Sequence, residues 1–414
     1  MHMLSSRNRS EFLAVPELVR LSMPQGSDGR EPTLLIKASA LNLQYFLRLR
    51  QFNLIILLIS GRWLGYGVEL LDDAEHPAML WSLLEYADEL EALKALQRRS
   101  KCIVHLFNEI VVNIAWAEVS IDLRQDHLAD VLQFAELHPT SDQSAAADVS
   151  AKLDGLFRGT IGPPEAYRVA VGPEVSWHEL RNTYITNRAS ASSVSMFGTD
   201  EGGQQEEIAL WLTDSIHPPG AVKNPLVHVP GRPARELCDL LFSYPNGAFL
   251  FESKSLAVLS RPTLPTREKL ARDIVKDARR GVKQLSGALK NLRRGYRITA
   301  PNGDEISVER EKLPHVVVLV PDLELINDAL DLGGAFIEGF LKSDAAFLHF
   351  LDPAELLRVV QAGEMLAARS SRLTPIECLD AYLVQRFDKA VTCPSPAMHI
   401  LLKFADDDAS IGDN

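Results

Sequence analysis

The sequence lacks the features that mark several common protein classes. Its longest purely apolar run, Leu54 to Ile59, is too short to cross a membrane, and its first residues contain no apolar core of the signal-peptide kind. The four cysteines show neither a CxxC pair nor zinc-ligand spacing, so a reducing, cytoplasmic setting is expected. We find no GxxxxGK(S/T), GxSxG or HExxH motif, no heptads and no internal repeat. These absences argue against an ATPase motor.

Composition and charge leave room for a soluble protein of two or three domains. The chain has 414 residues, of which 46% are hydrophobic and 24% charged, with a formal net charge of −12. An acidic average disfavours nucleic acid as a partner, but the charge is uneven. Residues 254–297 contain 13 Lys and Arg against 3 acids, a local excess of +10 that leaves −22 for the remainder. Such a basic segment suits a phosphate-backbone substrate, although a solvated helix face is the plainer interpretation.

One apolar hairpin carries polar residues that require an explanation. Two apolar runs, Leu237–Tyr244 and Ala248–Phe251, flank Pro-Asn-Gly, and Asn-Gly between such runs is a strong hairpin signal. Asp239 lies in the first run, and Glu252 and Lys254 end the second. On a strand, residues two apart leave the same face. The sequence therefore places an acid and a lysine together, with a second acid on the neighbouring strand.

The chemistry of these three residues favours a metal site. Two carboxylates that converge repel each other unless a cation lies between them. Their hard oxygen ligands suit Mg²⁺, or Mn²⁺, with water in the remaining positions. A lysine beside such a metal can hold or deprotonate a water, or neutralise charge on a phosphate. Glu252-Ser253-Lys254 is the only (Asp/Glu)-x-Lys sequence in the chain.

Asp239, Glu252 and Lys254 in this setting resemble the PD-(D/E)XK nuclease superfamily, which has the restriction-endonuclease-like fold. The resemblance covers roughly residues 200–320, and Cys238 replaces the proline of the family motif. It implies a core that runs helix, three antiparallel strands, helix, strand. It also implies a glutamine on the helix after the acid-x-Lys strand, for which Gln284 is the candidate, and a metal-facing glutamate on the first helix. Glu207 is our choice for that glutamate, with Glu206, Glu179 and Glu236 as competitors.

The sequence predicts an α/β (α+β) protein in three parts. Residues 1–138 are expected to form an α+β module that senses a signal or binds a protein partner. Residues 139–150, which are small and polar, are expected to be a linker. Residues 151–414 are expected to form the nuclease-like domain with a C-terminal helical extension.

Periodicity predicts the elements of the N-terminal module. The first thirty-odd residues are expected to be a loosely ordered lead-in, and His105 amid apolar neighbours is expected to be a core or edge residue. The predicted elements are strands Asn53–Ile59 and Gly65–Leu71, a helix from His76 to Arg98, and strands Lys101–Phe107 and Glu109–Ala117.

The same approach predicts the elements of the C-terminal part. A long helix is expected from Pro265-Thr266 to about Arg294, with the apolar residues Leu270, Ile274, Ala278, Val282, Leu285, Leu289 and Leu292 on one stripe. The other expected elements are helices Gln204–Ile216 and Ala354–Ala362, strands Leu226–Val229, His315–Val320 and Phe347–Leu351, and helical residues 375–390. We expect Asp352-Pro353 to open a helix that Gly363 stops, and the acidic tail Asp406–Asp408 to be disordered.

These observations favour a Mg²⁺-dependent nuclease that hydrolyses phosphodiester bonds, with DNA as the favoured substrate. Asp239 and Glu252, together with Glu207, would hold the metal. The catalytic residues would be Asp239, Glu252, Lys254 and Gln284, and Arg279, Arg280 and Lys283 would bind the nucleic acid. By analogy with the family, a role in prokaryotic restriction, repair or anti-phage defence is expected, and a homodimer is one option. The alternatives are a non-catalytic nucleic-acid-binding domain on the same fold and a protein-interaction scaffold.

Overall fold

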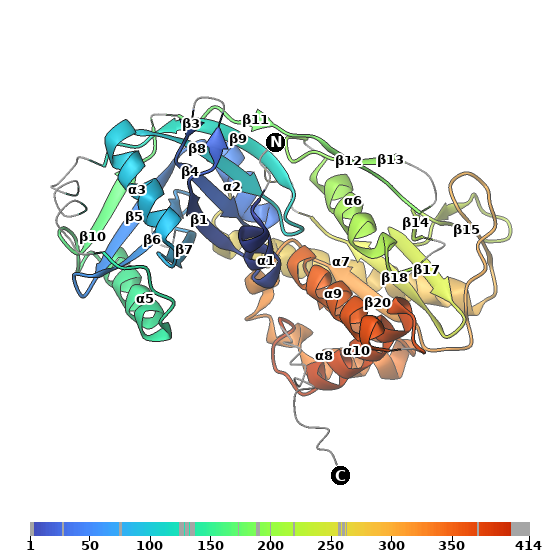
Figure 1. Ribbon diagram of the computed structural model, residues 1–414. Coiled ribbons are helices and arrows are strands. Elements are labelled where there is room, and N and C mark those ends of the chain that lie inside the picture. The colour runs from blue at the N-terminus through green and yellow to red at the C-terminus, as the bar shows by residue number, and fades with distance from the viewer. Residues whose placement is uncertain are drawn as a thin grey trace, which may run out of the picture. The chain divides into compact units, whose positions relative to one another are not determined.

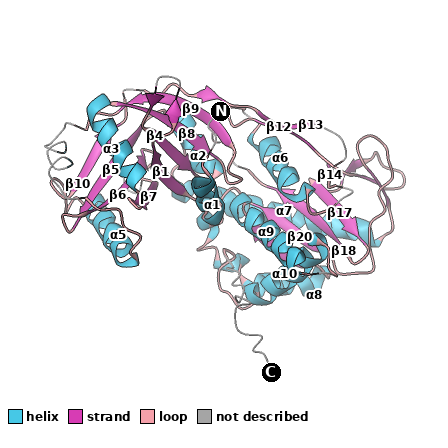
Figure 2. Cartoon of the chain, in the orientation of Figure 1, coloured by secondary structure: helices cyan, strands magenta, loops and turns pink. Residues whose placement is uncertain are grey.

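The chain is a mixed α+β protein with several sheets, as the sequence predicts (Figures 1 and 2). The computed structural model describes residues 4–26, 29–73, 77–123, 128, 132, 137–172, 174–187, 191–198, 200–217, 220–255, 258, 261, 263–370 and 372–398. Within these residues, no helix has both the length and the apolar character that a membrane span requires.

Contacts divide the chain into two compact units, and neither is a continuous stretch. The first unit comprises Met1–Trp211, Ser253–Asp277 and Val320–Asp322. The second comprises Leu212–Glu252, Ala278–Leu319 and Leu323–Asn414.

The first unit contains two main sheets and several helices. Its helices are α1 (Ser6–Ala14), α2 (Ala40–Leu49), α3 (Ala87–Arg99), α5 (Gln143–Phe157) and most of α6 (Glu201–Asp214). Its strands are β1 (Leu18–Ser22), β2 (Gln25–Gly26), β3 (Gly29–Arg30), β4 (Thr33–Lys37), β5 (Phe52–Ile59), β6 (Trp63–Leu70), β7 (Met79–Leu83), β8 (Lys101–Phe107), β9 (Asn113–Ser120), β10 (Ala166–Ala170), β11 (His178–Glu179), β12 (Asn182–Ile185) and β13 (Ala191–Val194). One sheet has the order β1-β4-β8-β9-β11 and the other the order β10-β5-β6-β7.

Helix α5 shows how apolar periodicity builds the core of this unit. Its apolar residues recur at steps of four and three, so they form one stripe that packs on the β5–β6–β7 side of the second sheet. The buried stripe consists of Ala145, Val149, Leu153 and Leu156. At Gly65 in β6, an added Cβ would lie 2.7 Å from Val149, so the glycine permits the close approach of helix and strand.

Four features of the first unit differ from the sequence-based expectations. The expected lead-in contains α1 and β1, which packs against β4. The first part of the expected helix from His76 is strand β7, where Leu80 pairs with Val68, and His76 itself lies outside the described residues. Most of the expected linker 139–150 belongs to α5, and the contact-based division falls at Trp211 rather than near residue 138.

The second unit is built on a five-stranded sheet whose spatial order follows the chain. Its strands are β14 (Val222–Lys223), β15 (Leu226–His228), β16 (Arg235–Glu236), β17 (Leu240–Tyr244), β18 (Gly247–Ser253), β19 (Arg297–Thr299), β20 (His315–Leu319) and β21 (Phe347–Leu351). The order of the main sheet is β14-β17-β18-β20-β21, and β16-β15-β19 form a small second sheet. β14, β17 and β18 pair antiparallel, whereas β20 and β21 are parallel.

Helices surround this sheet in the second unit. They are the part of α7 (Arg267–Arg293) from Ala278 onward, α8 (Gly334–Asp344), α9 (Pro353–Arg369), α10 (Pro375–Ala390) and the short turns η2 (Glu324–Ile326) and η3 (Leu330–Leu332). The predicted apolar stripe of α7 is confirmed, since all seven residues from Leu270 to Leu292 are buried. The hairpin is also confirmed, with Tyr244 paired to Gly247 across a loop of Pro245 and Asn246.

Gly363 does not stop a helix, contrary to expectation. Asp352 caps α9 as predicted, accepting the N–H of Glu355 at 2.7 Å, but α9 continues through Gly363 to Arg369. An added Cβ at Gly363 would lie 3.2 Å from both the Cβ and the backbone nitrogen of Leu379 in α10. The glycine therefore serves the close packing of α9 and α10, which lie side by side (Figure 1). The acidic tail lies outside the described residues.

Candidate functional site

The hairpin brings Asp239 and Glu252 to the same end of two adjacent strands. Leu240 of β17 pairs with Phe251 of β18, and the two acids come directly before Leu240 and directly after Phe251. The backbone N–H of Asp239 donates to the carbonyl of Phe251 at 3.0 Å, which holds Asp239 against β18. The two carboxylates therefore occupy neighbouring positions at the end of the hairpin.

Both acids are buried, and their charges help to raise the pKa of Cys238, the residue directly before Asp239. Asp239 is 7% exposed and Glu252 is 2% exposed. Cys238 is fully buried and donates its thiol to the carbonyl of Leu240 at 3.2 Å. Burial raises the pKa of Cys238 well above its ordinary value, and the negative charges of Glu252 and Asp239 raise it further. Cys238 is therefore a protonated thiol at neutral pH, and part of the rise in its pKa comes from the two nearby acids.

Lys254 follows the end of β18 and is half-buried. It is two residues beyond Glu252, as the acid-x-Lys pattern requires. By contact it belongs to the first unit, whereas Asp239 and Glu252 belong to the second.

Helix α7 carries the other predicted polar residues of the site. Gln284 is exposed on α7, one turn after Arg280. Arg279, Arg280 and Lys283 are exposed on the same helix, as a phosphate-binding role requires. Arg279 forms an ion pair with Asp331 of η3.

The four candidate helix glutamates have different surroundings. Glu207 and Glu206 are half-buried on α6, and the hydroxyl of Tyr184 donates to the backbone carbonyl of Glu207 at 2.9 Å. Glu179 accepts from Ser195 and, at 3.0 Å, from Arg181. The Ser195 hydrogen bond is the main reason that the pKa of Glu179 is lowered. Glu236 is exposed on β16.

The donor set at the hairpin fits a magnesium ion held by few protein ligands. In the part of the chain that the structure describes, no group of three or more His, Cys, Asp and Glu residues is arranged to hold a metal. Mg²⁺ keeps several waters and is commonly held by only one or two carboxylates together with substrate phosphates. Asp239 and Glu252 supply two buried carboxylates, which is enough for such a site and too few for a closed structural one.

A second polar cluster in the second unit is absent from the sequence-based predictions. Nδ1 of His315 lies 2.9 Å from Nε2 of His349, and Nε2 of His315 lies 2.6 Å from a carboxylate oxygen of Asp380. Burial, followed by the charge of His315, lowers the pKa of His349 well below its ordinary value, so His349 is neutral. Burial alone would raise the pKa of Asp380, but its hydrogen bond with His315 lowers it. These residues lie far apart in sequence, so no local pattern indicates them.

Comparisons with protein-family models, with curated proteins and with solved structures gave no match. The functional assignment therefore depends on the residues and their geometry.

Proposed function

We propose that the protein is a metal-dependent nuclease that hydrolyses phosphodiester bonds, with DNA as the favoured substrate. The observation that carries the proposal is the placement of Asp239 and Glu252, two buried carboxylates at the same end of β17 and β18, with Lys254 two residues further along. Two buried carboxylates on neighbouring strand positions repel each other, and a cation bound between them relieves that repulsion.

The order of elements around this hairpin also supports the proposal. α6 precedes β14, β17 and β18, which pair in series as antiparallel strands, and α7 then leads to β20 beside β18. This order is consistent with the helix, three strands, helix, strand core that the resemblance to PD-(D/E)XK nucleases implies. The small sheet β16-β15-β19 is an addition to that order.

Each residue has a defined part in the proposed reaction. Asp239 and Glu252 would hold Mg²⁺ or Mn²⁺ through carboxylate oxygens, and the ion supplies Lewis-acid polarisation of the phosphate. The ammonium of Lys254 would hold the attacking water or offset the negative charge that develops on the phosphate. Gln284 would orient that water or a backbone phosphate, and Arg279, Arg280 and Lys283 would bind the phosphate backbone. Glu207 would be the metal-facing glutamate that the resemblance implies, and the proposal does not depend on it.

A cleavage assay with the full-length protein tests this function. Supercoiled plasmid, linear DNA and RNA are incubated with Mg²⁺ or Mn²⁺ and with the wild type, Lys254→Ala or Lys290→Ala. Lys290 is an exposed lysine of α7 outside the proposed site. We expect metal-dependent cleavage that falls by roughly 100-fold or more in Lys254→Ala, because a charge that stabilises the transition state is lost. Lys290→Ala should retain cleavage within a few-fold of the wild type.

Two outcomes of the assay would contradict the proposal. Equal cleavage by the wild type and Lys254→Ala would mean that Lys254 has no part in the reaction. Metal-independent binding of nucleic acid without cleavage would favour the alternative of a non-catalytic nucleic-acid-binding protein. The observation on the side of that alternative is that no group of three or more His, Cys, Asp and Glu residues is arranged to hold a metal among the described residues.

A further inference from the structure

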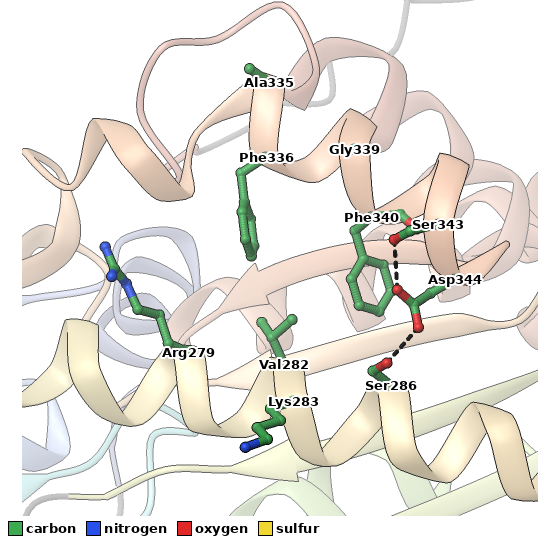
Figure 3. Close-up of a pocket in the computed structure, with 10 residues that line it drawn as sticks. All are labelled: Arg279, Val282, Lys283, Ser286, Ala335, Phe336, Gly339, Phe340, Ser343 and Asp344. Atoms are coloured by element: carbon green, nitrogen blue, oxygen red, sulfur yellow. Dashed lines mark hydrogen bonds between the residues drawn. The ribbon is translucent and has the colours of Figure 1, made fainter.

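A cavity of about 650 Å³ lies between α7 and α8 in the second unit (Figure 3). Its volume is in the range of small-molecule sites, which commonly measure about 300–1,000 Å³. Neither Asp239 nor Glu252 lines it, so the cavity is distinct from the proposed metal site.

The middle of the cavity is apolar and aromatic. Phe336 and Phe340 point from α8 toward α7, and Val282 points back from α7 between them (Figure 3). Phe340 is 6% exposed and fixed in the core, whereas Phe336 is only half-buried. A planar ring placed here could stack on an aromatic side chain that is already held in position.

The two ends of the cavity differ in charge. Arg279 and Lys283 from α7 line the cavity: Arg279 lies at one end, where it also forms an ion pair with Asp331, and Lys283 is exposed to solvent (Figure 3). At the other end, Asp344 accepts hydrogen bonds from Ser286 at 2.5 Å and from Ser343 at 2.7 Å (Figure 3). These hydroxyl groups fix the carboxylate, which keeps lone pairs for a further donor. From one end of the cavity to the other, a ligand would thus meet basic side chains, aromatic rings and a carboxylate that accepts hydrogen bonds.

Helix α8 contributes a glycine to the wall of the cavity. Gly339 lies in the middle of α8 and lines the cavity, and an added Cβ there would meet no atom within 4 Å. Glycine inside a helix costs about 1 kcal/mol of stability relative to alanine. No neighbouring atom makes a glycine necessary at this position. A bare backbone facing a cavity is suited to the close approach of a ligand.

We propose that this cavity binds a nucleotide whose base carries an amino group. The phosphate would meet Lys283 and Arg279, the base would stack beside Phe336 and Phe340, and the amino group would donate to Asp344. Adenine, guanine and cytosine meet this description, and the nucleotide is either free or one unit of a single strand. The cavity shares Arg279 and Lys283 with the backbone contacts of the proposed nuclease, but none of its residues is assigned to the metal, so nucleotide binding can be measured apart from cleavage.

Calorimetric titration of the full-length protein tests the proposal. The probes are AMP, GMP, CMP and UMP and a short single-stranded oligonucleotide, each added to the wild type, Lys283→Ala, Gly339→Leu and Gly287→Leu. Gly339→Leu adds bulk at the wall of the cavity without removing a packing contact. Gly287 on α7 has equally open surroundings but does not line the cavity, so Gly287→Leu is the matched control.

We expect at least one amino-bearing nucleotide to bind, and Lys283→Ala and Gly339→Leu to weaken it by roughly tenfold or more, with Gly287→Leu near the wild type. Binding of the oligonucleotide alone, with the same response to the variants, would identify a single strand as the source. Binding of UMP as tight as that of the others would overturn the placement of the base at Asp344. No binding of any probe, or equal binding by all variants, would overturn the proposal.

Discussion

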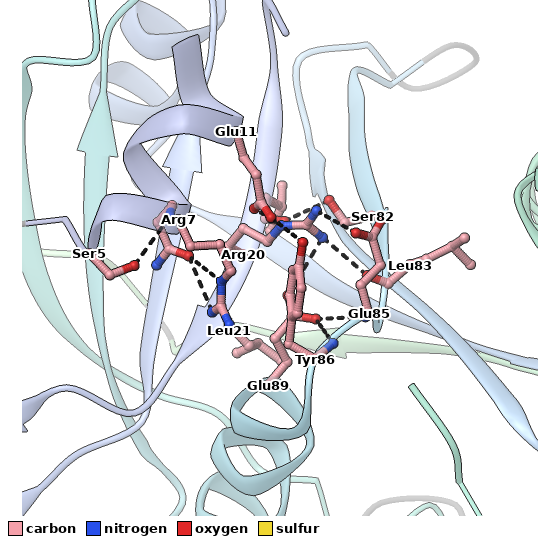
Figure 4. A network of polar contacts seen from close by, with 12 residues as sticks. Ser5, Arg7, Glu11, Arg20, Leu21, Ser82, Leu83, Glu85, Tyr86 and Glu89 are labelled. Carbon is pink, nitrogen blue, oxygen red and sulfur yellow. Dashed lines mark hydrogen bonds and ion pairs between the residues drawn. The ribbon is translucent and has the colours of Figure 1, made fainter. Parts of the chain in front are cut away.

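Arg20 shows how the first unit accommodates a group of buried charges (Figure 4). Its guanidinium lies 2.9 Å from Glu11, 3.2 Å from Glu85 and 3.5 Å from Glu89. The side chain of Arg20 is 5% exposed and that of Glu89 is not exposed at all. Burial raises the pKa of Glu89, and Arg20 acts in the opposite direction. One cation therefore offsets the charges of three acids, one from α1, one just before α3 and one in the first turn of α3.

Replacing Arg20 should strongly destabilise the fold. Arg20→Met would leave Glu89 buried without its cation, and breaking a buried pair in this way costs about 3–5 kcal/mol. The control is Lys101→Ala, whose ion pair with Glu118 has side chains 71% and 61% exposed, so its loss should change the stability little. Urea denaturation of both variants measures the two costs. Similar small losses would show that Arg20 does not hold the acids together.

Tyr86, in the same network, should produce a stability loss at alkaline pH. Its hydroxyl donates to Glu11, and this hydrogen bond is the main reason that its pKa rises to about 12. The unfolded value is near 10, so the folded state keeps the proton to higher pH. The resulting stability is fully present below pH 10 and is lost as the pH rises toward 12.

The tyrosinate absorbance of the wild type and Tyr86→Phe should differ in this window. Subtracting one titration curve from the other should give a single group that ionises near pH 12, and the wild type should lose more stability than Tyr86→Phe between pH 10 and 12. Identical stability curves for the two proteins would contradict the assigned hydrogen bond.

At the scale of elements, two helical glycines of the second unit should respond oppositely to the same change. Gly363 in α9 would place a Cβ 3.2 Å from atoms of α10, whereas Gly339 in α8 faces open space. Gly339→Ala should therefore stabilise the protein by up to about 1 kcal/mol through helix propensity. Gly363→Ala should destabilise it, because the contact with α10 has to give way. Thermal unfolding measures both, and stabilisation by Gly363→Ala would contradict the packing described here.

Elements with a strong local signal were predictable from the sequence. The hairpin at Pro245-Asn246, the apolar stripe of α7 and the cap at Asp352 each depend on neighbouring residues alone. β7 was not predictable, because Leu80 and Leu83 have helical spacing yet pair with Val68 and Gly65 of β6. Gly363 likewise ends a helix by local rules, and only the presence of α10 explains why it does not.

The candidate site divides in the same way. The sequence indicates Asp239 and Glu252, and the strand pairing that brings them together follows from a short hairpin. The cavity residues Val282 and Phe340 belong to α7 and α8, which are separated in the chain by β19, β20 and the turns η2 and η3. The pairing of His315 with Asp380 depends on the packing of α10 in the same way. No local sequence pattern predicts these contacts between residues that lie far apart in the chain.

For the whole molecule, the division into units predicts the fate of a truncated chain. The chain passes between the units within α6, at the end of β18, within α7 and on both sides of Val320–Asp322. Strand β10 pairs with β5, and β11 pairs with β9, so a cut near residue 138 removes the partners of both. It also exposes the apolar stripe of α5.

Residues 139–414 alone should therefore aggregate or lack cooperative unfolding. Size-exclusion chromatography and thermal unfolding of this fragment, beside the full chain, check the expectation. A monomeric fragment with a sharp transition would show that residues 1–138 form a separable domain, as the sequence alone suggests.

The most direct test of the central claim is the binding of Mn²⁺ by the full-length protein, measured by electron paramagnetic resonance with and without a short DNA duplex. The variants are Asp239→Asn, Glu252→Gln and, as a control, Glu311→Gln, which changes an exposed acid of the second unit. We predict that the wild type and Glu311→Gln bind Mn²⁺ alike and that each site variant weakens binding by roughly tenfold or more, since each removes one of two protein ligands. Equal binding by all four proteins, or no binding by the wild type even with DNA, would contradict a metal site at Asp239 and Glu252.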